Sequence, residues 1–467
     1  MVLDTRRITL LPAAGLLVAA GCGDTPSVGQ ADEDAVAPVA APVSSSAQGI
    51  IDLPGEDRAL EVHAEQLFVG HVNPEGWRVL GPANRWLRSW RVNFRPGQTR
   101  TSSDVRLGFD AEGRLHVLDP GTWRVYVVDP EGTLLREFGV AAREARRDRR
   151  SSAPARLGVG PDGSVLVCEY AAEECRVYST EGELERAVGS GYHAGPAGIT
   201  DHFRSARSST AFFTLLDPGG AWVIERTVLA DAGAETTGLA NVWSPPERPR
   251  GAGGSEGSTM SIVTRPDSPD SVTVTVSPGH PFLPMLHYDA LPGGGFAFVD
   301  STTYVVKLAS PDGRVHRTIR RPLVPQPISE EMRAAERRQL YEGAESVANN
   351  FPEGNREVVG HALRDAVAEA YFHDEMAVVR NLLSTWEGGL WVQRSGEDPD
   401  GDGGPIDVLA PDGNYVGTID PKDGGRLLST LRHGRVAFGP DGLVAFVEDA
   451  PHEGTFVVLK RLPPEVR

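Results

Sequence analysis

The sequence has a deficit of positive charge, with 46 Lys and Arg against 64 Asp and Glu and a formal net charge of -18. Proteins bind a nucleic-acid backbone through an excess of cations, so we expect no nucleic-acid partner. Zinc-site patterns are also missing, because the 12 histidines include no H-E-x-x-H and no close His/Cys pairing of ligand spacing. The acidic balance fits a soluble protein outside the cell, or one that meets cations or basic surfaces.

The apolar run near the N-terminus, "ITLLPAAGLLVAAG", is too short to be a comfortable transmembrane span. It follows Arg6 and Arg7 and ends in small residues before Cys22, which is the pattern of an export signal. It resembles a bacterial lipoprotein signal with Ala19-Ala20-Gly21-Cys22 as the lipobox. The resemblance implies that residues 1–22 are removed or processed and that Cys22 carries the lipid. The protein would then be membrane-anchored in the bacterial cell envelope, in the periplasm or at the cell surface. A secretory signal that is cut elsewhere is the alternative.

Residues 23–57 are rich in Ala, Pro, Ser and Asp and contain no aromatic residue. Such a segment cannot bury enough apolar surface to order itself. We therefore expect a disordered tether at 23–57 and a folded domain at 58–467.

A short phrase recurs along that domain. "GRLHVLD" at Gly113–Asp119 returns as "GSVLVCE" at Gly163–Glu169, and looser copies begin near Gly219, Gly294, Gly388 and Gly442. In each copy a glycine is followed at +2 and +4 by apolar residues and at +6 by a charge. The first two copies align over a longer stretch with a constant offset of 50 residues, which marks a repeat fold.

Within each repeat the apolar residues alternate with period two, which indicates strands joined by Gly-containing tight turns. Four short antiparallel strands per repeat make a propeller blade. The sequence therefore predicts an all-β fold, a six-bladed β-propeller. The last repeat supplies only three evident strands, so we expect the alternating stretch Glu61–Val72 to complete it and close the ring between the two ends of the domain.

The stretch "GRLHVLDPGTWRVYVVDPEG" resembles an NHL repeat. The matching positions are Gly113, Val117, Asp119, Arg124, Val125 and Val127. The chain is thus similar to the six-bladed NHL-like (TolB-like) propeller lipoproteins, most of which lack an assigned activity. This resemblance implies an exported propeller and names no substrate.

The charges at +6 end the second strand of each blade and would lie around one mouth of the central channel. They are Asp119, Glu169, Glu225, Asp300, Arg394 and Glu448. One interpretation is that each acid hydrogen-bonds the adjacent turn, as short polar side chains often do. The other is a cation or polar-ligand site on the channel axis.

The longest insertion, at about 325–375, falls between blades four and five. Ser329–Asn350 has an N-cap serine and acidic residues in its first turn, which predicts a helix. A second helical stretch follows Asn355. We expect a helical hairpin that either caps the channel mouth or packs down the side of the disc.

The loop "GEDPDGDGGPID" contains Asp398, Asp400 and Asp402 in a D-x-D-x-D-G pattern. Oxygen ligands at alternate positions followed by glycine form the first half of a calcium loop. Position twelve is Leu409 rather than Glu, and Asp407 could serve as a later ligand. Calcium binding and a solvated acidic loop both remain open.

Two cysteines, Cys168 and Cys175, remain once Cys22 is lipidated. An exported protein permits a disulfide between them. Strand parity argues against it, because Cys175 is expected on the same side as Val167 while Cys168 faces the other way, and a disulfide needs a shared face.

Our leading functional hypothesis is a non-catalytic, lipid-anchored scaffold that binds a protein, peptide or glycan on the face that carries the insertions. The alternative is a metal-dependent lactonase or lyase with its ion at the central channel. That alternative requires at least two of the strand-end acids on one metal.

Overall fold

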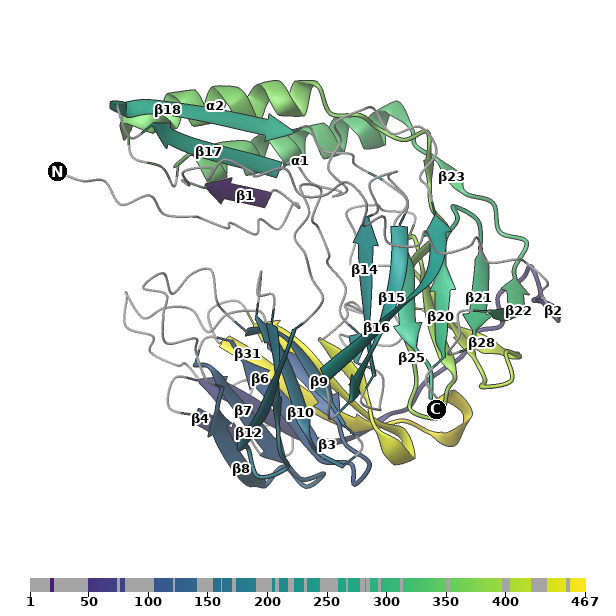
Figure 1. Cartoon of the computed structure of the whole chain (residues 1–467). Coiled ribbons are helices and arrows are strands. Elements are labelled where there is room, and N and C mark those ends of the chain that lie inside the picture. The colour runs from purple at the N-terminus through teal and green to yellow at the C-terminus, as the bar shows by residue number, and fades with distance from the viewer. Residues whose placement is uncertain are drawn as a thin grey trace, which may run out of the picture.

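The computed structural model describes residues 49–79, 105–140, 154–189, 282–396, 404–420 and 435–467 with short gaps. It also describes the strands at 17–20 and between 204 and 277. The described part is mostly β, with two long helices (Figure 1). Six sheets are numbered here in chain order as sheets 1 to 6, and each contains a run of four antiparallel strands.

Sheets 1 to 3 are simple meanders in which each strand pairs with the next. Sheet 1 contains β5 (Arg106–Phe109), β6 (Leu115–Asp119), β7 (Arg124–Val128) and β8 (Leu134–Gly139). Sheet 2 contains β9 (Pro154–Val159), β10 (Val165–Glu169), β11 (Glu174–Tyr178) and β12 (Leu184–Gly189). Sheet 3 contains β13 (Arg204–Ser205), β14 (Thr210–Leu216), β15 (Trp222–Ala230) and β16 (Gly233–Trp243).

Sheets 4 and 5 repeat this meander. Sheet 4 contains β19 (His287–Ala290), β20 (Phe296–Val299), β21 (Val305–Ala309) and β22 (Val315–Arg320). Sheet 5 contains β25 (Val379–Ser384), β26 (Leu390–Arg394), β27 (Ile406–Leu409) and β28 (Tyr415–Ile419).

Sheet 6 is built from both ends of the folded chain. Its C-terminal strands are β29 (Val436–Phe438), β30 (Leu443–Ala450) and β31 (Gly454–Arg461). The fourth strand is β3 (Glu65–Asn73), which pairs antiparallel with β31 so that Val69 faces Val458 across the ladder. A fifth strand, β4 (Gly76–Val79), follows it. The stretch predicted to complete the last repeat is thus the one that pairs there.

The first strands of neighbouring sheets lie beside one another. β29 lies beside β5, β5 beside β9, β9 beside β13, β13 beside β19 and β19 beside β25. A succession of four-stranded antiparallel meanders stacked through their faces is the arrangement of a β-propeller. Each sheet alone would leave two apolar faces in water, so the sheets are stable only by packing on their neighbours.

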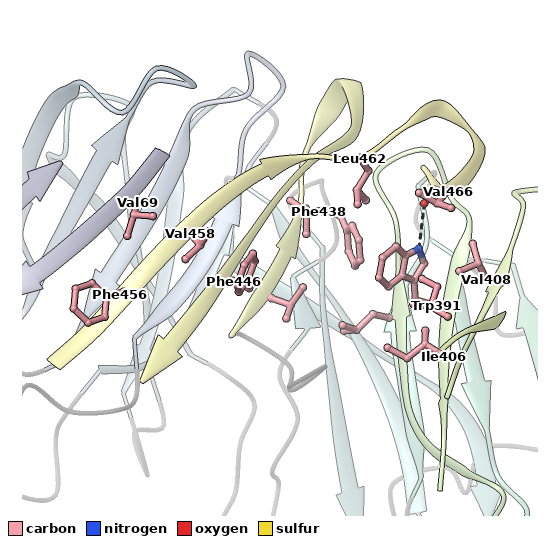
Figure 2. Close-up of a cluster of buried hydrophobic side chains, with 14 residues drawn as sticks. Val69, Trp391, Ile406, Val408, Phe438, Phe446, Phe456, Val458, Leu462 and Val466 are labelled. Atoms are coloured by element: carbon pink, nitrogen blue, oxygen red, sulfur yellow. Dashed lines mark hydrogen bonds between the residues drawn. The ribbon is translucent and has the colours of Figure 1, made fainter. Parts of the chain in front are cut away.

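Sheets 5 and 6 are joined by a buried apolar cluster (Figure 2). Trp391 of sheet 5 meets Phe438 of sheet 6 edge to face, with ring centroids 5.1 Å apart. Its indole N–H donates to the carbonyl oxygen of Val466 at 3.2 Å, in the short 3-10 helix Pro464–Val466. The C-terminus therefore closes over this interface, where the buried ring also finds its hydrogen-bond partner.

The repeated glycine has the conformation that the repeat requires. Gly113, Gly163, Gly388 and Gly442 have φ values of 77°, 87°, 95° and 76°. An L side chain is strained in this left-handed region, and glycine is not. The recurrence of the phrase therefore follows from a turn that only glycine makes without strain.

The N-terminal segment 49–60 differs from the expected tether. Strand β2 (Ile50–Asp52) pairs in parallel with β22 at the outer edge of sheet 4. Further on, Ala59 bridges Thr418 at the outer edge of sheet 5. Residues 49–57 are thus an ordered strap across two sheets, and the disorder predicted for them is wrong. Exposed sheet edges offered hydrogen bonds that composition could not reveal.

Helices α1 (Glu330–Asn349) and α2 (Glu353–Ala368) occupy the two stretches predicted as helical. They pack on each other through a small core of their own that includes Leu340, Val359 and Leu363. Strands β17 (Thr259–Arg265) and β18 (Ser268–Ser277) form a hairpin beside α2, and β1 (Leu17–Ala20) pairs with β17. These elements form a layer at the top of Figure 1, outside the six sheets.

The helical layer stands on a narrow stem. Strands β23 (Gln326–Pro327) and β24 (Glu375–Met376) pair with each other antiparallel. The amide of Ile328 donates to the carbonyl oxygen of Asp374 at 2.8 Å. The two ends of the insertion are therefore adjacent, which lets it emerge from between sheets 4 and 5 without altering either meander.

Candidate functional site

The strand-end acid of sheet 1 serves its own turn. The buried carboxylate of Asp119 accepts a hydrogen bond from the Thr122 hydroxyl at 2.7 Å, and its carbonyl oxygen accepts one from the Trp123 amide at 2.9 Å. The Asp119 side chain therefore bonds within the adjacent turn, although its partner there is the Thr122 side chain and not the backbone of the first interpretation.

The strand-end acid of sheet 4 is neutralised by a lysine of the same sheet. The Asp300 carboxylate lies 2.6 Å from the ammonium group of Lys307, which also lies 5.5 Å from the ring centroid of Phe298. Its charge is therefore already paired. The side chains of Glu169, Glu225 and Glu448 lie outside the described residues, so their predicted place at the channel mouth stays a prediction.

The strand-end arginine of sheet 5 belongs to a four-residue charge cluster. We call Asp57, Arg321, Arg394 and Asp407 the clamp. Arg321 lies 2.7 Å from Asp407 and 2.6 Å from Asp57, and Arg394 lies 2.8 Å from the other oxygen of Asp57. The charges sum to zero, and the Arg321 and Asp407 side chains are fully buried. The strap, sheet 4 and sheet 5 each contribute to it.

Arg321 also bonds the backbone of the strap. Its Nε and Nη2 atoms donate to the carbonyl oxygens of Pro54 and Glu56, both at 2.9 Å. Its guanidinium lies 4.9 Å from the ring centroid of Tyr415. Because a guanidinium has five N–H donors in a fixed plane, it can join two carboxylates and two carbonyls at once. This side chain thus adds to the strand pairing that holds the strap on sheet 4.

The electrostatics of the clamp favour charged rather than neutral groups. Burial alone would lower the pKa of Arg321, but its hydrogen bond and ion pair with Asp407 outweigh that effect and leave the pKa above its usual value. Burial would raise the pKa of Asp57, yet the hydrogen bonds and charges of Arg394 and Arg321 hold it below 3.8. Burial and the adjacent Asp407 carboxylate raise the pKa of Tyr304 well above 10.0. None of these groups is suited to exchange protons near neutral pH.

Asp407, the candidate late ligand of the aspartate loop, is part of the clamp. One of its carboxylate oxygens accepts from the Thr418 hydroxyl at 2.6 Å and meets Arg321. The positive charge of Arg321 thus already balances the negative charge that Asp407 would offer to a calcium ion. Asp398, Asp400 and Asp402 lie outside the described residues, and so does Cys22. Within the ranges that are described, no group of three or more His, Cys, Asp or Glu could hold a metal ion.

The sequence analysis did not single out a buried His–Asp pair in sheet 1. Nε2 of His116 lies 3.0 Å from the Asp110 carboxylate, which also receives Nε of Arg114 at 2.6 Å. Both His116 and Asp110 are fully buried, and Nδ1 of His116 has no hydrogen-bond partner in the described part of the chain. Burial lowers the pKa of His116 below 6.5, so the ring is neutral at neutral pH. Only the spacing of six residues across the first turn could have suggested this pair.

The expected orientation of the two cysteines is also wrong. Cys168 of β10 and Cys175 of β11 are direct register partners. Directly opposed residues of an antiparallel pair share one face of the sheet, whatever the parity of their numbers across the connecting loop. The parity argument counted through the loop as if it were strand.

No helix among the described residues is long and apolar enough to cross a bilayer. No family model matches the chain, and no curated protein matches it either.

Several solved structures are similar to the chain over most of its length, at low identity. A member of the DUF4221 family from Bacteroides vulgatus is 10% identical, with a TM-score of 0.46, covering 87% of this chain and 99% of that one. A streptogramin B lyase is 12% identical, with a TM-score of 0.36 and coverages of 78% and 95%. A calcium-binding regucalcin from Agrobacterium tumefaciens is 12% identical, with a TM-score of 0.33 and coverages of 88% and 95%. At such identities and scores, none of them assigns an activity to this protein.

Proposed function

We propose that the protein is an exported, lipid-anchored, six-bladed β-propeller that acts as a non-catalytic binding scaffold. Its ligand would be a protein, peptide or glycan, bound on the side that carries the helical layer. In this proposal Cys22 holds the lipid and the chain belongs to the NHL-like propeller lipoproteins.

The closed six-bladed ring is supported by the order of the sheets. Five of the six neighbouring pairs have adjacent first strands, and the sixth, sheets 5 and 6, shares the Trp391 cluster. Sheet 6 draws strands from both chain ends, which joins the beginning and the end of the ring. A ring closed in this way leaves no exposed blade face.

One observation carries the functional part: helices α1 and α2 share a core of their own and stand on a two-strand stem. A blade link needs only a few residues, so about 50 residues with a core of their own are not required for closure. Insertions on a rigid framework commonly carry binding, because the framework holds them in place.

Three of the strand-end charges have described side chains, and their contacts do not support catalysis at the channel. Asp119 serves a turn, Asp300 pairs with Lys307, and Arg394 pairs with Asp57. These contacts already use the carboxylate and guanidinium groups that a lactonase or lyase would present to an ion or substrate. The metal-dependent alternative therefore gains no support from them.

The test is an excision. Joining Pro327 to Glu375 with a short Gly-Asn turn would remove residues 328–374, because β23 and β24 already lie side by side. The intact and excised chains are compared on immobilised peptide and glycan libraries. We expect binders that retain the intact chain and lose the excised one. The proposal fails if the excised chain, with unchanged tryptophan emission, keeps every ligand of the intact chain, or if the intact chain binds nothing. All eight tryptophans lie outside residues 328–374, so their emission reports on the sheets that remain.

The anchor has a separate test. Expression in a bacterial host with labelled palmitate should label the intact chain, and Cys22→Ser should abolish the label. Elemental analysis of the purified protein addresses calcium and the metal-dependent alternative together. Stoichiometric metal that survives Asp398→Asn but is lost on Asp119→Asn would revive the enzyme hypothesis.

A further inference from the structure

The hairpin of β10 and β11 brings two cysteines to the same rung of one ladder. The register runs from Val165 opposite Tyr178 to Cys168 opposite Cys175. This rung is next to the ends of both strands, Glu169 and Glu174. The register of the two backbone strands is thus what places Cys168 opposite Cys175.

Sheet 1 shows what this rung does in the repeat. At the offset of 50 residues, Cys168 corresponds to Leu118 and Cys175 to Val125. Leu118 and Val125 are also register partners, and both are fully buried in one apolar cluster between sheets 1 and 2. In sheet 1 this rung therefore carries two side chains, Leu118 and Val125, into the layer between neighbouring sheets.

The backbone geometry of such a rung is compatible with a covalent bond. Opposed residues in an antiparallel pair have Cα atoms about 4.5 Å or about 5.5 Å apart, depending on the hydrogen-bonding pattern of the rung. Disulfides have Cα separations of about 4.4–6.8 Å. Both kinds of rung fall in this range, so no movement of the backbone is needed.

We propose that Cys168 and Cys175 form a disulfide that closes the end of the β10–β11 hairpin. This inference deepens the proposed function, since export would bring the chain into an oxidising compartment. The bond would link the two strands next to their ends at Glu169 and Glu174.

The reaction is a thiol–disulfide exchange. The thiolate of one cysteine attacks a protein or glutathione disulfide and forms a mixed disulfide, with one thiolate of the oxidant leaving. The thiolate of the second cysteine then attacks the first cysteine's sulfur and displaces the remaining thiolate of the oxidant. The two cysteines lose two protons and two electrons to the oxidant, whose disulfide becomes two thiols. The exchange therefore needs a disulfide oxidant and no metal ion or molecular oxygen.

The test reads the covalent state by mass. The full chain is equilibrated in a glutathione redox buffer, denatured, and alkylated with iodoacetamide without reduction. Trypsin releases Leu157–Arg176 as a single peptide that holds both cysteines, since no Lys or Arg lies between them. We expect this peptide unalkylated and lighter by two hydrogen atoms, and alkylated twice only after reduction. Cleavage at Glu169 should leave two pieces still linked.

A doubly alkylated peptide without prior reduction would overturn the proposal. So would a peptide linked to Cys22 or to a second chain. The variants C168S and C175S provide a second measurement that does not depend on digestion. Dithiothreitol should lower the Tm of the parent chain and leave the Tm of C168S/C175S unchanged. Equal shifts in both would contradict the bond. Neither result depends on whether the protein binds a ligand, so failure here is distinct from failure of the scaffold proposal.

Discussion

At the residue scale, the stability of this protein depends on a few positions with unusual backbone or charge. The repeated glycine is one of them, and two of its copies differ in surroundings. A Cβ on Gly113 would lie 2.9 Å from the Leu443 side chain of the neighbouring sheet, whereas one on Gly388 would meet only Pro292 at an ordinary 3.4 Å.

We therefore expect G113A and G388A to destabilise the protein by different amounts. Both incur about 1–2 kcal/mol for a side chain in the left-handed region. G113A should cost more, because Leu443 must also move. Urea unfolding followed by circular dichroism measures both. A smaller loss for G113A than for G388A would show that the inter-sheet contact is not tight.

The clamp makes a second residue-scale prediction. R321M leaves the buried Asp407 without its main partner and releases the strap carbonyls, so we expect a loss of about 3–5 kcal/mol in the free energy of unfolding. The neighbouring Arg320 has an exposed side chain, and R320M is a matched control that should change the free energy by less than about 0.5 kcal/mol. Equal effects of the two variants would refute the clamp.

The buried His116 gives a pH dependence with a definite sign. Its pKa lies below 6.5 in the folded chain, so the unfolded chain takes up this proton at a higher pH. The contribution is fully present above about pH 6.5 and is lost as the pH falls toward the lower folded pKa. H116Q keeps a donor for Asp110 but does not titrate.

We accordingly expect the unfolding free energy of H116Q to depend less on pH below 6.5 than that of the parent chain. H361Q, at an exposed histidine of α2, should leave the slope unchanged. Urea unfolding between pH 5 and pH 7.5 measures this dependence. If the unfolding free energies of H116Q and of the parent change equally with pH, His116 does not cause the pH dependence.

At the element scale, the sequence predicted some elements well because their signals are local. Period-two alternation and turn glycines mark β5 to β12, and an N-cap serine with acidic neighbours marks α1. The hydroxyl of Ser329 accepts from the Met332 amide at 3.2 Å, as a cap should. The strap was missed because its order comes from edges that other segments provide.

This origin of the strap's order leads to a truncation test. A chain that begins at residue 49 lacks β1 but keeps the strap, whereas one that begins at residue 58 also loses β2 and Asp57. Two arginines would then share Asp407 alone, and we expect a loss of roughly 3 kcal/mol. Urea denaturation of the three chains checks it. Equal urea midpoints for the chains that start at 49 and 58 would mean that the strap contributes nothing to the stability of the sheets.

At the scale of the whole molecule, the joint between the two chain ends should govern cooperativity. Val69 of β3 is buried against the cluster of sheets 5 and 6. V69D puts a charge there, and we expect a loss of more than about 3 kcal/mol, with the whole chain still unfolding in one shifted transition. Far-UV circular dichroism and tryptophan fluorescence should move together. Separate transitions would show that the sheets do not form one cooperative ring.

The sequence alone determined the order of strands and turns, because the alternation of apolar and polar residues and the left-handed glycines act within a few residues of the chain. It also allowed the end-to-end strand to be anticipated, since the last repeat lacked one. Only the tertiary structure decided which charges pair. Asp57 and Arg321 are far along the chain from each other and from Arg394 and Asp407, and no local pattern links them. The partners in the cysteine rung and in the His116–Asp110 pair are close along the chain, and it is the register of their hairpins that brings them together.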